Sequence, residues 1–176
     1  LKQFLSDPRV VELSRPLWWL ILNGVILRFR PKRSAAAYRQ VWSEQGSPLL
    51  VESRAIAEAL QQALSGRLSQ PVRVELAMRY GAPSIAHGLE QLRQANARRI
   101  LVLPLYPQYS ATTSASTFDE ISRVLRGWRW LPELRLINHY HDDPGYIQAL
   151  AESVRHFAPD DGSRERLLMS FHGIPQ

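Results

Sequence analysis

The chain has 176 residues and no cysteine, and its 22 lysines and arginines against 16 acidic residues give a formal net charge of +6. A domain of this length can bury roughly 70% of the surface that its unfolded chain exposes, so a full hydrophobic core is available. The lack of cysteine excludes disulfide bonds, cysteine-bound zinc and cysteine-bound iron–sulfur clusters from these residues, and it fits a reducing compartment.

The first candidate element is the most apolar stretch of the chain, Leu17 to Phe29, which runs into a basic cluster ending at Arg33. Asn23 and Gly24 interrupt the stretch, which is shorter than the roughly 20 residues of a transmembrane helix. Two interpretations of residues 17–33 stay open. They form either a helix or helical hairpin half-buried against the domain, or an interfacial element whose tryptophans and basic residues meet an anionic membrane surface.

The net charge is concentrated in the same region. Up to Arg33 there are seven basic and two acidic residues, which leaves +5, and the rest of the chain carries only +1. A nucleic-acid-binding surface needs basic residues spread along one face, so we expect no nucleic-acid partner. Leu1 to Pro8 lack the apolar run of a signal peptide. The expected location is the cytoplasm, either free or peripheral on the inner face of the membrane.

Past Arg33, the apolar periodicity predicts helices that alternate with strands. The expected helices are Ala35 to Glu44, Glu52 to Leu64, Pro83 to Ala95, Thr117 to Leu125 (capped by Ser116) and Pro144 to Phe157. The expected strands are Pro71 to Tyr80, Arg99 to Leu105, Leu134 to His139 and Arg166 to Phe171. We therefore expect one domain over residues 1–176, with a helical, apolar and basic segment at 1–33 and an α/β core at 34–176.

Strands that alternate with helices of this length predict a doubly wound parallel sheet, an α/β fold of the Rossmann-like kind. In such sheets ligands bind outside the carboxyl ends of the strands. The residues at these ends are aromatic or ionisable: Arg79-Tyr80, Tyr106 with Tyr109-Ser110, His139-Tyr140-His141-Asp142, and His172. No glycine-rich phosphate loop follows any strand, which argues against a nucleotide cofactor.

The histidines at these strand ends differ in their context. His139 and His141 alternate at the end of an expected strand, so they are predicted to face opposite sides and not to form a metal pair by spacing alone. His172 follows an apolar strand and precedes Gly173, where the backbone must turn. A neutral imidazole there can bind ferrous iron and accept a proton, or it can be a buried, hydrogen-bonded histidine.

Five separated motifs occur in a fixed order: Leu1 to Val11, Gly46-Ser47-Pro48, Met78-Arg79-Tyr80, Tyr106 to Ser116, and Ser170 to Pro175. With these motifs the chain resembles the proteobacterial ferrochelatases, the enzymes that insert ferrous iron into protoporphyrin IX to form protohaem. The resemblance implies that the chain is the N-terminal of two such α/β domains. It also implies that the family's first strand precedes Leu1 and that the second half, which carries an acidic residue opposite the histidine, follows Gln176.

The resemblance further implies roles for particular residues. His172 is the implied catalytic residue and metal ligand, which handles iron and the pyrrole protons. The implied substrate contacts are Arg30, Tyr38, Ser47, Arg79, Tyr106 and His141, the last of which stands where relatives have a tyrosine. Two structural alternatives stay open: Arg79 can instead neutralise a neighbouring carboxylate, and the hydroxyl groups of Tyr109 and Thr112 to Ser116 can instead satisfy the loop's own backbone and cap the next helix.

No cofactor is implied, because ferrous iron is itself a substrate. The implied partners are protoporphyrin IX, ferrous iron and the missing C-terminal half of the same enzyme, and the 176 residues alone are expected to be inactive. A single-domain tetrapyrrole chelatase of the cobalt or sirohaem type and a non-catalytic tetrapyrrole-binding fragment are the alternative functions.

Overall fold

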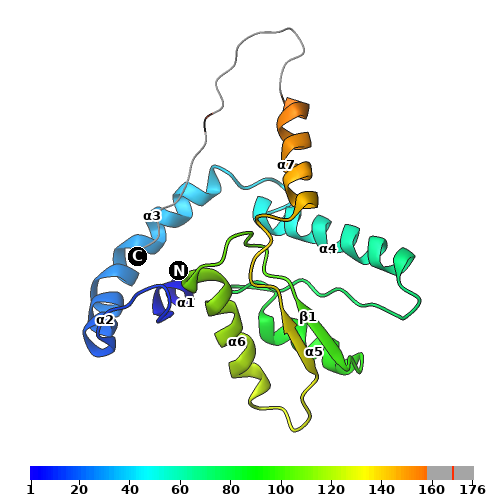
Figure 1. Cartoon of the computed structure of the whole chain (residues 1–176). Helices are drawn as coiled ribbons and strands as arrows, with labels where there is room; N and C mark the ends of the chain where they lie inside the picture. The colour runs from blue at the N-terminus through cyan, green and yellow to red at the C-terminus, as the bar shows by residue number, and fades with distance from the viewer. Residues whose placement is uncertain (158–167, 169–176) are drawn as a thin grey trace. The chain divides into compact units, whose positions relative to one another are not determined.

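The computed structural model describes residues 1–157 and 168 (Figure 1). The chain separates into two compact units, residues 1–138 and 139–176. The first unit contains α1 (Lys2–Ser6), α2 (Arg15–Ile21), the π-helix η1 (Leu22–Ile26), α3 (Leu27–Arg39), α4 (Pro48–Arg67), α5 (Ile85–Gln94), β1 (Arg99–Val102), the π-helix η2 (Ala111–Ala115), α6 (Ser116–Leu125) and β2 (Glu133–Leu136). The second unit contains α7 (Pro144–Phe157), at the bounds that the sequence predicts.

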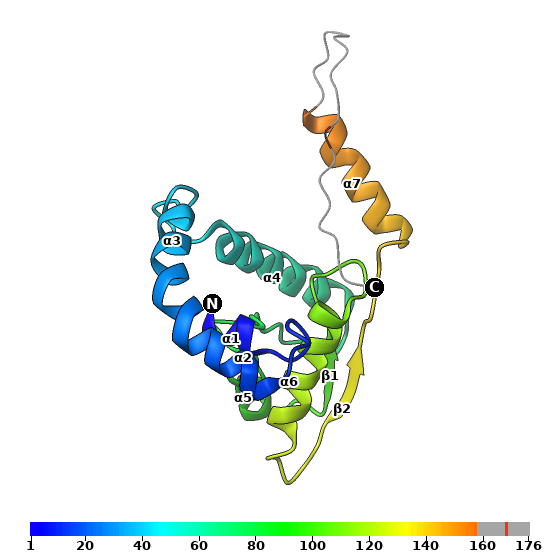
Figure 2. The same ribbon diagram turned by 90° about the vertical axis from the view of Figure 1, so that its left-hand side faces the viewer.

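A small parallel sheet and the helices beside it confirm the α/β fold class. Strands β1 and β2 pair in parallel, with Arg99 opposite Glu133 and Val102 opposite Leu136. The connection between them passes through η2 and α6, as expected for a parallel crossover. Figure 2 shows α5 and α6 on one side of the two strands. The buried core lies between these elements and consists of Ile85, Leu89, Ile100, Ile121 and Leu125.

The predicted strand Pro71 to Tyr80 is not formed. Within this segment the only strand-like pairing among the described residues is an isolated bridge between Met78 and Ser84. The side chain of Gln61 on α4 replaces a neighbouring strand: its Nε2 donates to the carbonyl of Val72 at 2.9 Å, and its Oε1 accepts from the N–H of Val74 at 2.7 Å. An apolar, extended sequence becomes a strand only when a second strand lies beside it, and here a side-chain amide takes that place.

The two strands that do form are shorter than predicted. The predicted strand Arg99 to Leu105 ends at Val102, two residues before Pro104, which has no N–H to donate to a ladder. The predicted strand Leu134 to His139 is shifted to Glu133–Leu136, and the last ladder bond runs from the N–H of Ile137 to the carbonyl of Val102 at 3.0 Å. The predicted strand Arg166 to Phe171 lies outside the described residues, apart from Leu168.

Four of the five predicted helices have different bounds, although α5 and α6 differ only by one or two residues at an end. The apolar segment and the helix predicted at 35–44 form one helical run from Arg15 to Arg39, because η1 carries the chain past Asn23 and Gly24 without a break. Helix α4 is longer than predicted and begins with Pro48 at its first turn. Helix α3 runs through residues 33 and 34, and the division of the chain at that point stays a prediction. None of the described helices is both long and apolar enough to cross a membrane.

Candidate functional site

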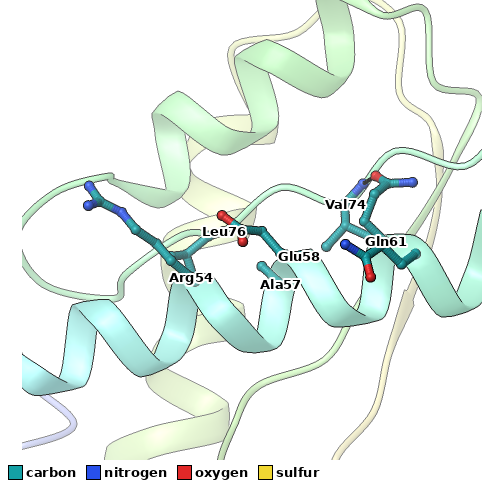
Figure 3. A pocket seen from close by; sticks show the side chains of 7 residues that line it. Arg54, Ala57, Glu58, Gln61, Val74 and Leu76 are labelled. Atoms are coloured by element: carbon teal, nitrogen blue, oxygen red, sulfur yellow. Dashed lines mark hydrogen bonds between the residues drawn. The ribbon is translucent and has the colours of Figure 1, made fainter.

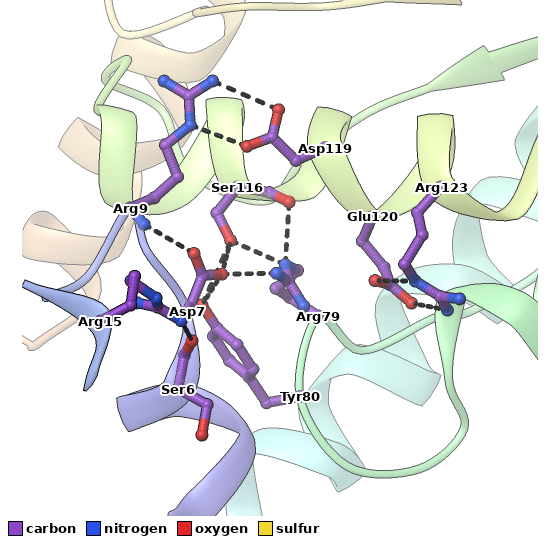
Figure 4. A network of polar contacts seen from close by, with 10 residues as sticks. All are labelled: Ser6, Asp7, Arg9, Arg15, Arg79, Tyr80, Ser116, Asp119, Glu120 and Arg123. Carbon is purple, nitrogen blue, oxygen red and sulfur yellow. Dashed lines mark hydrogen bonds and ion pairs between the residues drawn. The ribbon is translucent and has the colours of Figure 1, made fainter. Parts of the chain in front are cut away.

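A buried carboxylate joins three parts of the first unit (Figure 4). The Asp7 side chain, only 3% exposed, follows α1. Its Oδ2 accepts hydrogen bonds from an Arg79 Nη2, from the Tyr80 hydroxyl at 2.8 Å and from the Ser116 hydroxyl at 2.5 Å. Its Oδ1 accepts from the backbone N–H of Arg9 at 2.8 Å. Asp7 therefore ties the N-terminal segment to the 79–80 segment and to the start of α6.

The other bonds of this cluster strengthen the same connection. Arg79 Nε donates to the hydroxyl oxygen of Ser116 at 2.7 Å and to its carbonyl at 2.9 Å. The Arg79 guanidinium also lies 4.5 Å from the centre of the Tyr80 ring. The edge of Phe4 packs against the same ring, with the two ring centres 5.2 Å apart. We call Asp7, Arg79, Tyr80 and Ser116 the Asp7 cluster.

The cluster holds its groups in fixed protonation states. Burial alone raises the pKa of Asp7, but the hydrogen bonds from Ser116, the Arg9 N–H and Tyr80, together with the charge of Arg79, outweigh it and hold that pKa below its ordinary value. Burial and the adjacent Asp7 carboxylate raise the pKa of Tyr80 to about 12, although the contact with the Ser116 hydroxyl acts to lower it. At neutral pH Asp7 is thus ionised and Tyr80 neutral, which suits their donor and acceptor roles.

The loop after β1 leads from Tyr106 through η2 into α6. Ser110 caps η2: its Oγ accepts from the N–H of Thr112 at 3.1 Å. Ser114 is fully buried, and its hydroxyl donates to the carbonyl of Asn138, just after β2, at 3.4 Å. The loop hydroxyls thus bond mainly within the fold, as the structural alternative from the sequence predicts. Short π-helices are rare and are often found at functional sites.

The predicted cap of α6 is wrong. Ser116 was expected to cap this helix, but it is the first residue of α6, which continues directly from η2. Its side chain is fully buried and donates to Asp7 instead. The capping role falls to Ser110, six residues earlier, because the π-helix extends the helical run toward the N-terminus.

A hollow of about 300 Å³ opens at the carboxyl end of β2, beside the same loop. Its lining combines one cation, an amide, an aromatic pair and aliphatic groups: Arg9, Tyr109, Ser114, Ala115, Phe118, Leu136 and Asn138. The Arg9 guanidinium is held by the Asp119 carboxylate, at 2.8 and 3.2 Å. This volume is at the lower end of the ~300–1,000 Å³ of ligand pockets, and the pairing with Asp119 offsets the positive charge of Arg9 beside the hollow.

A second hollow, of about 410 Å³, lies between α4 and the extended 74–76 segment (Figure 3). It is lined by Arg54, Ala57, Glu58, Gln61, Gln62, Val74 and Leu76. Gln61 is already bonded to the backbone of the extended segment. We assign this hollow no role.

The predicted site residues lie in different places. Arg30 and Tyr38 are both exposed on α3, and Ser47 precedes α4 without a side-chain bond to that helix. Tyr106 is exposed in the loop after β1, and Arg79 is largely buried in the Asp7 cluster. His172 lies outside the described residues. The structure therefore joins Arg79 to the loop that carries Tyr106, through Ser116.

The arrangement of His139 and His141 differs from the prediction. They were expected on opposite faces of a strand, but the two rings lie side by side with their centres 5.4 Å apart. The reason is that β2 already ends at Leu136, so the alternation of a strand does not extend to these residues. In the part of the chain that the structure describes, no three histidine, aspartate or glutamate side chains gather as a metal-binding group.

Sequence reasoning missed Asp7 as a central residue. The motifs that contain Asp7, Arg79 and Ser116 are visible in the sequence, but their connection spans 72 and 109 residues. No local pattern reports such a pairing. The available signal was a charged residue next to Pro8, close to the apolar Phe4 and Leu5.

Comparison with known proteins gives a consistent result. The family model for ferrochelatase matches residues 1–176. Curated proteins named ferrochelatase are similar over the whole chain: one from Thioalkalivibrio sulfidiphilus is 64% identical, and those from Nitrosococcus oceani and Azoarcus sp. are each 55% identical. In each of these comparisons the match covers 100% of this chain and 48% of the relative. The chain thus spans about half the length of the curated relatives that it matches.

Proposed function

Because the chain belongs to the ferrochelatase family, we propose that it is the N-terminal domain of an enzyme that inserts ferrous iron into protoporphyrin IX, the last step in making protohaem. The observation that carries the proposal is the family match from the first residue to the last, together with 64% identity to a protein named ferrochelatase. The alternatives from the sequence, a single-domain tetrapyrrole chelatase or a non-catalytic fragment, have no comparison in their favour.

The chemistry asks for a proton acceptor. Two pyrrole N–H protons must leave as one ferrous ion enters the ring, and the ion itself is a substrate. His172 is the proposed acceptor and iron ligand, since a neutral imidazole has one lone pair that serves either purpose. No cofactor is required in this scheme, because neither the metal nor the porphyrin changes oxidation state.

The porphyrin carries two propionates and a large apolar face. Arg30, Tyr38 and Ser47 are proposed to bind the propionates by charge-assisted and hydroxyl hydrogen bonds. Tyr106 is proposed to contact the ring face, which its exposed position after β1 supports. That His141 contacts the porphyrin stays a prediction.

Arg79 was predicted to contact the porphyrin. Its bonds to Asp7 and Ser116 support a structural role instead, in which Arg79 fixes the start of α6 and with it the loop that carries Tyr106. Direct contact between Arg79 and porphyrin stays a proposal. The two roles can be separated by experiment, because direct contact with the porphyrin requires added porphyrin, whereas fixing the start of α6 does not.

We also propose that the helical run from α2 to α3 contacts the membrane surface. Trp19 and Phe29 are 63% and 73% exposed on the helical run from α2 to α3, and Arg28, Arg30, Lys32 and Arg33 are exposed close by in sequence. Trp18 differs, since its Nε1 donates to the carbonyl of Leu5 at 2.6 Å. Exposed aromatic and basic residues on one helical segment are suited to bind an anionic bilayer surface. A hydrophobic substrate such as protoporphyrin IX could then reach the enzyme from the membrane. The proposed location is the cytoplasm, with this segment in peripheral contact with the inner face of the membrane.

The test of the enzymatic proposal uses the longest natural protein that carries this sequence. Haem formation from ferrous iron and protoporphyrin IX should fall by at least about 100-fold in His172→Ala, the range expected for loss of a general base. His87→Ala, an exposed histidine on α5, should leave the rate unchanged. Near-normal turnover in His172→Ala would remove His172 from the mechanism.

A further inference from the structure

His139 and His141 lie in the segment that follows β2 and precedes α7, and all residues considered below belong to the second unit. Their imidazole rings are inclined at 48° with centres 5.4 Å apart. Both side chains are exposed, so no packing against a core explains why the rings lie together. The spacing is that of two rings in contact, and it brings two potential metal ligands together.

The distance between the ring centres is compatible with a shared metal ion. A transition-metal ion holds imidazole nitrogens at about 2.0–2.1 Å, and two imidazoles on one tetrahedral ion have ring centres about 5 Å apart. The observed 5.4 Å comes within a few tenths of an ångström of this value. The two rings thus lie close enough for one nitrogen of each to bind the same ion when both side chains are turned toward it.

The segment between the two rings is held in place. The ring of Tyr140 packs edge-on against Tyr146 in the first turn of α7, with centres 5.3 Å apart. The N–H of Asp143 donates to the carbonyl of Tyr140 at 3.2 Å and closes a turn. The middle residue is therefore anchored, while the histidines on either side stay exposed. Such preorganisation lowers the entropy lost when the second ligand binds.

Two acidic residues adjoin the pair, and they differ in availability. The Asp143 Oδ1 accepts from the N–H groups of Gly145 and Tyr146, at 2.9 and 3.1 Å, and caps α7. Asp142 is exposed and directly follows His141, so its negative charge favours a cation there. Water would complete the coordination of an ion held by only two imidazoles.

We propose that His139 and His141 form a binding site for one divalent transition-metal ion of the class that favours imidazole: Zn²⁺, Cu²⁺, Ni²⁺ or Fe²⁺. Two exposed ligands make a site of modest affinity that exchanges its ion readily. The site is distinct from His172 in sequence and does not rest on the proposed enzymatic function. Mg²⁺ should not occupy it, because Mg²⁺ prefers oxygen ligands.

The experiment is a calorimetric titration of the full chain with Zn²⁺. It is carried out in a His172→Asn background, so that this residue contributes no binding. We expect one Zn²⁺ per chain, and His139→Asn and His141→Asn should each weaken binding at least about tenfold, or 1.4 kcal/mol. The double variant should lose little more than either single variant, because the loss of one ligand already abolishes chelation.

The controls separate chelation from general binding by histidines. His87→Asn, on α5, should leave the Zn²⁺ affinity unchanged, and an excess of Mg²⁺ should not compete. Independently of any variant, ¹⁵N NMR of the histidine rings should show the signals of His139 and His141 shifting together at one equivalent of Zn²⁺. Binding should weaken in acid, since a protonated imidazole has no lone pair to offer.

Three results would overturn the proposal. One is an affinity unchanged in both single variants. Another is a fall in stoichiometry without a fall in affinity, which would mean that the two histidines bind separate ions. The third is competition by Mg²⁺ at similar concentration, which would assign the site to carboxylates.

Discussion

Replacing Asp7 with asparagine tests the Asp7 cluster directly. Asparagine has nearly the same shape, but it carries no charge and offers a single acceptor oxygen. Arg79, whose side chain is 16% exposed, would then keep its charge without a carboxylate partner. Removing one partner of a buried ion pair costs about 3–5 kcal/mol, since the remaining charge stays buried. The Asp7 side chain is buried nearly completely, so solvent screens this interaction little.

The assay is urea unfolding of the chain, followed by circular dichroism. With a slope of about 2 kcal/mol per M, a loss of 3–5 kcal/mol lowers the midpoint by about 2 M. This is a large share of the 5–15 kcal/mol that holds an ordinary domain together. Tyr80→Phe, which removes only one neutral donor to Asp7, should cost about 0.5–1.5 kcal/mol and keeps the test informative if Asp7→Asn does not fold.

The matched control is Asp119→Asn. Asp119 also pairs with an arginine, Arg9, but both side chains are about 40% exposed, so water replaces the lost contact. The midpoint should hardly move in this variant. Equal and small shifts for Asp7→Asn and Asp119→Asn would refute the reasoning, because burial would then not distinguish the two carboxylates.

Three further predictions follow from single contacts. Trp19→Ser should weaken binding to anionic vesicles, more so with added salt, whereas Trp18→Ser should mainly lower thermal stability because it loses the bond to Leu5; equal vesicle binding by both variants and the parent would exclude the membrane contact. The pKa of Tyr80 is about 12 in the folded chain and near 10 in the unfolded chain, so the stability that this group contributes is complete below pH 10 and is lost as the pH rises toward 12. Tyr80→Phe should therefore flatten the dependence of the unfolding free energy on pH between 10 and 12, and an unchanged dependence would contradict the assignment. Gln61→Leu should leave the Val72 carbonyl and the Val74 N–H without their partner and cost about 1–3 kcal/mol in urea unfolding, while Gln62→Leu, its neighbour, should cost clearly less.

Local patterns in the sequence predicted the elements whose formation depends on neighbours in the chain. Helix α7 has the predicted bounds because Pro144 starts it and its apolar period is regular. The family resemblance rests on motifs of the same local kind. The fold class followed because alternating helices and strands leave few arrangements other than a parallel sheet.

Features that depend on distant partners were not predictable in this way. The segment at 71–80 has the composition of a strand, yet its pairing depends on what lies beside it, and there Gln61 supplies the hydrogen bonds. Ser116 does not have its predicted capping role, because η2 extends the helical run before it and because its hydroxyl donates to Asp7, which is distant in the sequence. The position of the two neighbouring histidines changed because a strand ended three residues early.

The central claim concerns iron insertion, and haem formation measures it most directly. Ferrous iron and protoporphyrin IX are added, without oxygen, to the longest natural protein that carries this sequence and, separately, to the 176-residue chain. The account predicts steady haem production by the long protein and none above the protein-free rate by the chain, which spans about half the length of its relatives. No haem from the long protein, or steady haem from the 176-residue chain well above the protein-free rate and abolished in His172→Ala, would contradict it.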